Sequence, residues 1–106
     1  GVLTGVSDDI NPIPHQYELS QNYPNPFNPS TVISYALPVD AKVTLKVFDI
    51  LGREITTLVS QEMNAGVHRI KFDASQLSSG IYFYAIRAEG NNGSTFMNAK
   101  KFILMK

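Results

Sequence analysis

The sequence has no cysteine and no tryptophan among its 106 residues. Without cysteine it can form neither a disulfide framework nor a thiolate metal site, so the redox compartment stays open. No apolar run approaches the roughly 18 residues that a membrane-spanning helix needs. Net charge is also absent, because nine basic residues cancel nine acidic ones. Such a chain lacks the overall field that gathers nucleic acid or an anionic membrane surface.

The length allows one domain with a single modest core. Residues 1–16 are small, polar or acidic, include Pro12 and Pro14, and show no period, which is typical of a linker. We therefore expect a linker from an upstream domain over residues 1–16 and a folded domain over residues 17–106. The chain begins without methionine or a signal sequence, so we expect it to be a piece of a longer protein whose amino end carries any export signal.

Residues 21–30, which we call the proline strap, interleave three prolines and three asparagines with two aromatic residues. Each proline fixes its own φ and pushes the preceding residue toward an extended conformation, which excludes helix or central strand. Tyr23 and Phe27 offer apolar area, and asparagine side chains can hold turns. We expect a stiff segment with two aromatic anchors across one end of a β domain. The alternative is an exposed Pro26-x-x-Pro29 ligand for an aromatic groove.

Apolar and polar residues alternate along most of the remaining chain, which predicts β-strands. A change of parity within residues 54–61 indicates a bulge. Residues 81–87 are apolar on both faces, which predicts a central strand covered on both sides. Turns about every 9 to 14 residues and no helical pattern predict an all-β fold, an immunoglobulin/fibronectin-like antiparallel sandwich of about seven strands. The predicted strands are residues 17–19, 31–37, 42–49, 54–61, 67–73, 80–87 and 94–105.

Two hairpin turns have recognisable chemistry. Asp49 and Gly52 favour the first and last places of a type I turn, where glycine often supplies a positive φ. The Asn-Gly pair within residues 90–93 predicts a type I′ turn. If Gly52 and Gly80 hold positive φ, their replacement by valine should destabilise the fold by about 1 kcal/mol or more. Residues 102–105 should be buried on at least one side.

Few residues are candidates for chemistry. His15 lies in the linker and His68 stands alone in a strand, where packing at the edge of the core is the favoured role. Asp49 and Asp73 end strands, where a carboxylate accepts backbone N–H bonds. Residues 8–11 lack the further acidic ligands and closing glutamate of a calcium loop. We predict no catalytic residue, no metal site and no cofactor.

Two other features have competing interpretations. Tyr82, Phe83 and Tyr84 could offer a platform for sugar rings, but adjacent strand residues point to opposite faces. The basic end of the chain is too small for nucleic-acid binding, and its lysines could simply protect an edge strand from aggregation. These basic residues are Lys100, Lys101 and Lys106.

Four motifs stand in order along residues 17–106: YELSQNYPNPFNPST, VFDILGRE, LSSGIYFY and the terminal KKFILMK. Together they closely resemble the type A C-terminal sorting domain of the type IX (Por) secretion system, found on exported proteins of Bacteroidetes-like bacteria. The immunoglobulin-like domain of flagellar hook-capping proteins shares the aspartate-x-x-glycine hairpin but does not need a terminal lysine motif.

The resemblance implies a non-catalytic secretion signal at the end of a cargo protein. Such a cargo crosses the inner membrane, folds in the periplasm, and reaches the cell surface or the extracellular space. The implied partners are the outer-membrane translocon and its shuttle protein, the upstream cargo domain, and a sortase-like peptidase that cuts within residues 1–16. Nucleic acid and a membrane span are not implied.

Carried onto this sequence, the resemblance assigns recognition to four segments and leaves no catalytic residue. The alternative is an accessory β-sandwich module of a secreted hydrolase that binds carbohydrate or protein. The candidate recognition residues are Tyr23, Pro24, Asn25, Pro26, Phe27, Asn28, Pro29, Asp49, Gly52, Gly80, Tyr82, Lys100, Lys101 and Lys106.

Overall fold

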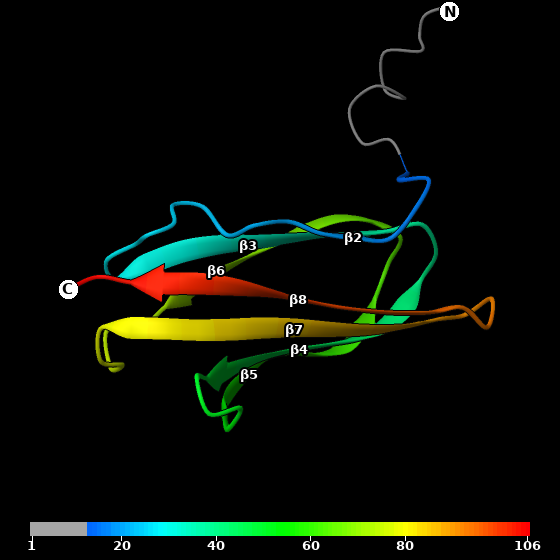
Figure 1. Cartoon of the computed structure of the whole chain (residues 1–106). Coiled ribbons are helices and arrows are strands. Elements are labelled where there is room, and N and C mark those ends of the chain that lie inside the picture. Colours follow the sequence, from blue (N-terminus) through cyan, green and yellow to red (C-terminus); the bar gives the residue numbers. More distant parts are fainter. Residues whose placement is uncertain (1–12) are drawn as a thin grey trace, which may run out of the picture.

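The computed structural model describes residues 13–106, which form two antiparallel β-sheets packed face to face (Figure 1). One sheet has the strand order β2-β3-β6 and the other the order β5-β4-β7-β8. This arrangement confirms the predicted all-β, immunoglobulin-like sandwich. The strands are β2 (Glu18–Leu19), β3 (Ser30–Leu37), β4 (Ala41–Asp49), β5 (Glu54–Met63), β6 (Gly66–Asp73), β7 (Gly80–Gly90) and β8 (Thr95–Leu104).

Residues 13–106 contain no helix with the length and apolarity of a membrane span. The first strand begins at Glu18, one residue after the predicted start of the folded domain. Residues 1–12 of the predicted linker lie outside the described residues. They include residues 8–11, which were compared with a calcium loop, and most of the expected cleavage region.

The core lies between the two sheets and follows the two-residue period of the sequence. In β4, Val43, Leu45 and Val47 are fully buried, whereas Lys46 between them points outward. Burying each such side chain contributes about 1.5 to 3 kcal/mol. The largest fully buried side chains are Tyr84, Phe102, Ile33, Leu37, Leu45, Leu104, Val43, Val47 and Thr31.

The predicted bulge is confirmed where β4 pairs with β5. The register shifts between Leu45 and Lys46 and again between Val47 and Phe48. β5 runs to Met63, two residues beyond its predicted end. Because each shift adds a residue to β5 only, the apolar residues of this strand change parity along its length.

The turn between β4 and β5 has the predicted type I chemistry. The Gly52 amide donates to the Asp49 carbonyl at 2.9 Å, and the Asp49 amide donates to the Arg53 carbonyl at 2.9 Å. Gly52 has a φ of 85°, so it occupies the left-handed position that follows a type I turn in a three-residue hairpin loop.

The predicted type I′ turn between β7 and β8 is wrong. A type I′ turn needs positive φ at both central residues, but no residue other than glycine has positive φ within residues 13–106. The Gly93 amide donates to the Gly90 carbonyl at 3.0 Å, and Gly93 alone supplies the positive φ, 88°. This loop therefore repeats the geometry of the turn between β4 and β5, because Gly93 falls one place later than a type I′ turn requires.

We expect Gly52→Val to lower the free energy of unfolding by about 1 kcal/mol or more, because a β-branched side chain is strained at positive φ. Gly80, whose φ is 153°, should respond to Gly80→Val in the same direction. Urea denaturation measures both. Gly52→Asn is the matched control, since asparagine tolerates this conformation and should cost less. Equal stability of Gly52→Val and the parent protein would contradict the assignment.

One prediction about burial is wrong. β7 is central in its sheet, but its outer face is not covered by another layer of residues 13–106, and Ile81 and Phe83 remain 38% and 36% exposed. Apolar residues on both faces therefore do not mean that both faces are covered in this strand. The predicted burial of residues 102–105 on at least one side is confirmed, since Phe102 and Leu104 lie in the core. Met105 is exposed, because β8 ends at Leu104 and the chain leaves the sheet there.

Candidate recognition surface

The predicted recognition segments meet at one end of the sandwich, which we call the motif end. Figure 1 shows the proline strap, the chain's carboxyl end, the start of β7 and the turn between β4 and β5 together there. The register explains this convergence, since Gly80 pairs with Leu104 and Tyr82 stands between Asp49 and Phe102. Segments far apart in the sequence therefore lie side by side, such as those of Gln21 and Lys101, which are 80 residues apart.

Backbone hydrogen bonds join the proline strap to β8. The Phe27 amide donates to the Ile103 carbonyl at 3.1 Å, and the Met105 amide donates to the Phe27 carbonyl at 3.0 Å. Side chains add two more bonds, because Asn25 Oδ1 accepts from the Ile103 amide and Gln21 Nε2 donates to the Lys101 carbonyl. The strap thus occupies the outer edge of the last strand where that strand ends.

Beneath this joint, aromatic rings pack around Phe102, which is fully buried. Its ring centroid lies 5.0 Å from that of Phe27 and 5.4 Å from that of Tyr82, which stacks on it. Phe72 of the other sheet meets its edge at 5.9 Å. Phe102 therefore connects the proline strap, β7 and β6 through one side chain.

The expectation of two aromatic anchors in the proline strap is half wrong. Phe27 is 3% exposed and anchors the strap, but Tyr23 is 80% exposed. Tyr23 is held by its backbone instead, which exchanges hydrogen bonds of 2.9 and 3.0 Å with Val32 of β3. Because the main chain supplies the attachment, the phenol ring is free to point into solvent. Pro26 and Pro29 on either side of Phe27 are also exposed.

A buried polar network that the sequence did not suggest fixes the start of the proline strap. Asn22 is 2% exposed, and its Nδ2 donates to the Pro24 carbonyl and to Thr31 Oγ1. The Thr31 hydroxyl donates in turn to the same carbonyl at 2.8 Å. These bonds close the loop between strap and β3. The sequence indicated that asparagine side chains could hold turns in this segment, but not that Asn22 would be buried.

Asp49 organises the turn at its side of the motif end. Its Oδ1 accepts from the Leu51 and Arg53 amides at 2.9 Å, and its Oδ2 accepts from Arg53 Nε at 2.8 Å. The hydrogen bond from the Arg53 amide is the main reason that the pKa of Asp49 lies below its ordinary value, and the Arg53 guanidinium lowers it further. The predicted structural role of this carboxylate is confirmed, and the turn holds Ile50 and Leu51 exposed.

The lowered pKa of Asp49 predicts acid sensitivity. A carboxyl whose pKa is depressed on folding stabilises the native state above its ordinary pKa, and this contribution is lost as pH falls below about 4. We expect Asp49→Asn to flatten the decline of thermal stability between pH 5 and pH 2, measured by melting temperature. Asp73 is the matched control at a different turn, because the Ser75 amide lowers its pKa in the same way. In the Asp73→Asn variant, the part of the stability decline that comes from Asp49 should remain.

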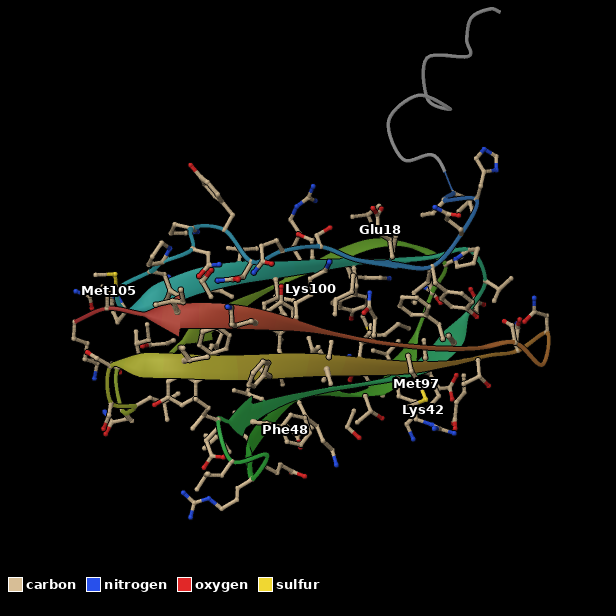
Figure 2. The ribbon with its side chains drawn as sticks, viewed as in Figure 1. Glu18, Lys42, Phe48, Met97, Lys100 and Met105 are labelled. Atoms are coloured by element: carbon tan, nitrogen blue, oxygen red, sulfur yellow. The ribbon has the colours of Figure 1, made fainter. Side chains whose placement is uncertain are left out.

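The three terminal lysines lie in different surroundings. Lys100 is half-buried on the side of β8 that faces β2 (Figure 2), whereas Lys101 is exposed on the opposite face. Lys106 follows the strand, and its Nζ donates to the Ser75 carbonyl at 2.6 Å. β8 is an edge strand of its sheet, which is the position where lysines can protect a strand from aggregation. Of the three, Lys101 presents its charge most openly at the motif end.

A shallow hollow of about 320 Å³ links the Asp49 turn to the start of β7. Exposed apolar side chains surround it, and the outer face of the sheet beside it carries Phe83 and Phe48, which points away from the other sheet (Figure 2). An exposed apolar area with a charged margin is typical of a protein-binding surface. The hollow is lined by Asp49, Ile50, Leu51, Arg53, Ile55, Ser79, Gly80, Ile81 and Tyr82.

His68, the histidine that was considered as a possible metal ligand, has a structural role. His68 stacks on Tyr35 with ring centroids 5.4 Å apart, which confirms packing at the edge of the core, and its Nε2 lies 2.7 Å from the Asn64 carbonyl. No cluster of three potential metal ligands occurs within residues 13–106.

Tyr82 and Tyr84 do not form a platform for sugar rings, because both are buried. Their hydroxyls donate to the Ser78 carbonyl at 2.7 Å and the Ser20 carbonyl at 2.6 Å. Burial raises the pKa of Tyr84 to about 12. Of the three adjacent aromatic residues, Phe83 alone faces outward.

A protein-family model described as "Secretion system C-terminal sorting domain" matches residues 21–104. The matched region begins within the proline strap and ends with β8, so it includes both partners of the hydrogen-bonded joint. No curated protein matches the sequence.

Two solved structures share the fold. Dimeric latent PorU from Porphyromonas gingivalis matches 84% of this chain at 20% identity with a TM-score of 0.65, and the match spans 9% of the PorU chain. CopC from Methylosinus trichosporium OB3b matches 84% of this chain at 14% identity with a TM-score of 0.59, over 93% of CopC. At these identities the likeness shows a common β-sandwich. The chain has the size of CopC and of a small part of PorU.

Proposed function

Because the chain belongs to the family of secretion system C-terminal sorting domains, we propose that it directs an attached cargo protein across the outer membrane by the type IX secretion system. It does so as a non-catalytic signal. A type IX sorting domain implies export to the cell surface or the extracellular space, and we infer that the cargo passes through the periplasm on the way. Cleavage by a sortase-like peptidase falls within residues 1–16.

The joint between the proline strap and β8 is the observation that carries this proposal. It brings the first and last motifs of the domain onto one surface, with the Asp49 turn and the start of β7 beside them. We infer that the outer-membrane translocon and its shuttle protein bind the motif end. Exposed apolar residues there supply contact area, and Lys101 supplies a charge at the margin.

Charge reversal at the motif end tests this inference. The chain is fused behind a periplasmic reporter in a host with the type IX machinery, and surface export is measured by protease accessibility of the reporter. We expect Lys101→Glu to lower export by about tenfold or more, because a like-charge contact at an interface costs several kcal/mol. Lys42→Glu is the control, since Lys42 is an exposed lysine on β4 at the opposite end of the sheet. Because this change sets glutamate opposite Glu62 and Glu89, circular dichroism checks that the control variant is folded.

Equal export of the Lys101→Glu and Lys42→Glu fusions, with both domains folded, would contradict recognition at the motif end. Deletion of residues 100–106 is a weaker test, because it also removes the buried Phe102 and Leu104. Lost export of that deletion would not separate recognition from unfolding.

A further inference from the structure

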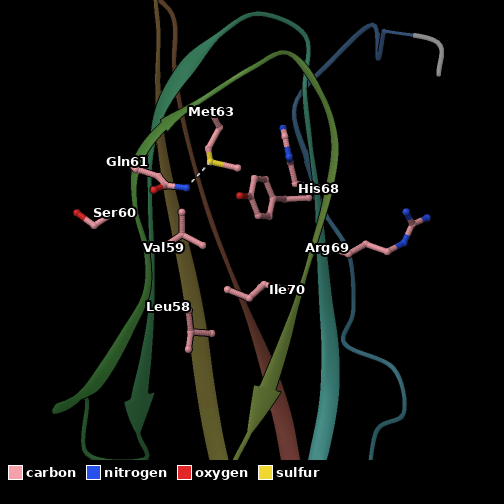
Figure 3. Close-up of a pocket in the computed structure, with 9 residues that line it drawn as sticks. Leu58, Val59, Ser60, Gln61, Met63, His68, Arg69 and Ile70 are labelled. Atoms are coloured by element: carbon pink, nitrogen blue, oxygen red, sulfur yellow. Dashed lines mark hydrogen bonds between the residues drawn. The ribbon is translucent and has the colours of Figure 1, made fainter.

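The two sides of the sandwich are closed differently. The proline strap, bonded to both β3 and β8, closes one side at the motif end. On the other side, β5 and β6 face each other from different sheets without pairing, and a hollow of about 300 Å³ lies between them (Figure 3). Leu58, Val59 and Ile70 point into this hollow, whereas Arg69 points away from it.

The hollow is flanked by a regular and unoccupied strand edge. β6 pairs with β3 over eight consecutive residues without a register shift, and β3 is its sole hydrogen-bonded strand within residues 13–106. The other long edges are compromised, since β5 is interrupted by two register shifts and β8 is occupied by the strap near its end. A long, unbroken edge exposes backbone groups that can pair with another extended chain.

The side chains of β6 specify what such a chain would contain. Arg69 and Lys71 are exposed on the outer face, and neither forms an ion pair within the described residues. His68, Ile70 and Phe72 alternate with them on the inner face. An incoming strand opposite residues 68–72 would therefore meet two cations on one face and Ile70 between two aromatic rings on the other. Asp73, on the face of the cations, lies at the end of β6.

A second copy of the chain fits this edge poorly. Antiparallel pairing of two β6 strands about Ile70 places Arg69 opposite the copy's Lys71, and it does so twice. Pairing about Arg69 places that cation opposite itself. Pairing about Lys71 does the same for Lys71, although it also sets Arg69 opposite the copy's Asp73 and overlaps fewer residues of β6. Because like charges directly opposite each other destabilise a strand pair, the two registers with the longest overlap, about Arg69 and about Ile70, disfavour self-association.

We propose that β6 accepts an extended strand of a partner protein in which acidic and apolar residues alternate. The acidic residues lie opposite Arg69 and Lys71, and the apolar residue between them lies against Ile70 over the hollow. Main-chain hydrogen bonds to β6 provide the attachment and the charges fix its register. This docking edge is distinct from the motif end and does not depend on the proposed export.

A synthetic peptide of alternating glutamate and valine is the probe, and the isotope-labelled chain of residues 1–106 is observed by amide NMR. We expect shifts confined to β6 and the residues of the hollow, with slowed hydrogen exchange along β6. The double variant Arg69→Glu, Lys71→Glu should weaken binding by about tenfold or more. Lys42→Glu on β4 is the control and should bind the peptide as the parent chain does.

Four results would overturn the proposal. One is no spectral change at millimolar peptide, and another is a set of shifts centred on β8. The third is binding of a control peptide as tightly as the glutamate–valine peptide. One control has lysine in place of glutamate and so has the wrong charge; the other has proline at its centre, which cannot complete a strand ladder. Concentration-dependent broadening of β6 without peptide would instead indicate self-pairing and would also contradict it.

Discussion

Replacing Phe102 with alanine should lower the free energy of unfolding by about 3 to 5 kcal/mol, the largest loss that we expect from any single change in this domain. The side chain is fully buried and contacts rings from the strap, β7 and β6. Its removal leaves a cavity where these segments meet, and a domain of this size has few other contacts to replace them. Equilibrium urea denaturation followed by circular dichroism measures the loss.

Two further variants make this result specific. Phe83→Ala removes the same ring from the outer face of the adjacent strand, where it is partly exposed, and should cost much less. Phe102→Leu keeps most of the apolar volume and should retain a cooperative transition if the alanine variant fails to fold. Similar midpoints for Phe102→Ala and Phe83→Ala would contradict a central role of Phe102.

The strands and the core could be predicted because their signal is local. Alternation in β3, β4 and β6 places the apolar side chains on one face whatever the tertiary partners are. The Asp49 turn was predictable for the same reason, since aspartate and glycine act within their own loop. The failure at Gly93 is equally local, because the Asn-Gly pair occurs in both turn types and the loop length decides between them.

The surface could not be predicted in the same way. The outer face of β7 has the composition of a covered face, and only the absence of a third layer among residues 13–106 shows that Ile81 and Phe83 are exposed. Tyr23 and Phe27 are both aromatic residues among the prolines of the strap, yet only Phe27 reaches the core. Phe27 is held by backbone bonds to Ile103 and Met105 where β8 ends, whereas the backbone of Tyr23 is bonded to Val32 of β3, and no local pattern contains that information.

Asn22 and the free edge of β6 show a second limit. A buried asparagine and an exposed one have the same sequence context, and the difference lies in partners such as Thr31 that the fold supplies. The edge of β6 depends on the strand order, which alternation does not determine. The four ordered motifs compensated in part, because their resemblance to a known family assigned recognition to four segments that the fold then brings to one end of the sandwich.

Phe27→Ala should lower the free energy of unfolding by about 2 to 4 kcal/mol and release the proline strap from β8. The Phe27 ring is the strap's buried anchor, and its amide and carbonyl make the two backbone bonds to Ile103 and Met105. Without the ring, these bonds become accessible to water. We therefore expect faster hydrogen exchange at the Met105 amide, with slow exchange retained in the centre of β4.

Tyr23→Ala is the informative partner of this variant, because Tyr23 lies in the same strap and is largely exposed. Its stability should stay within about 0.5 kcal/mol of the parent chain, as expected for a surface substitution. In the reporter fusion, reduced export of Tyr23→Ala at unchanged stability would mean that the translocon contacts the strap itself. If only Phe27→Ala loses export, the strap acts by holding β8 and the motif end in shape. Unchanged export of a Phe27→Ala domain whose strap is released would contradict both roles.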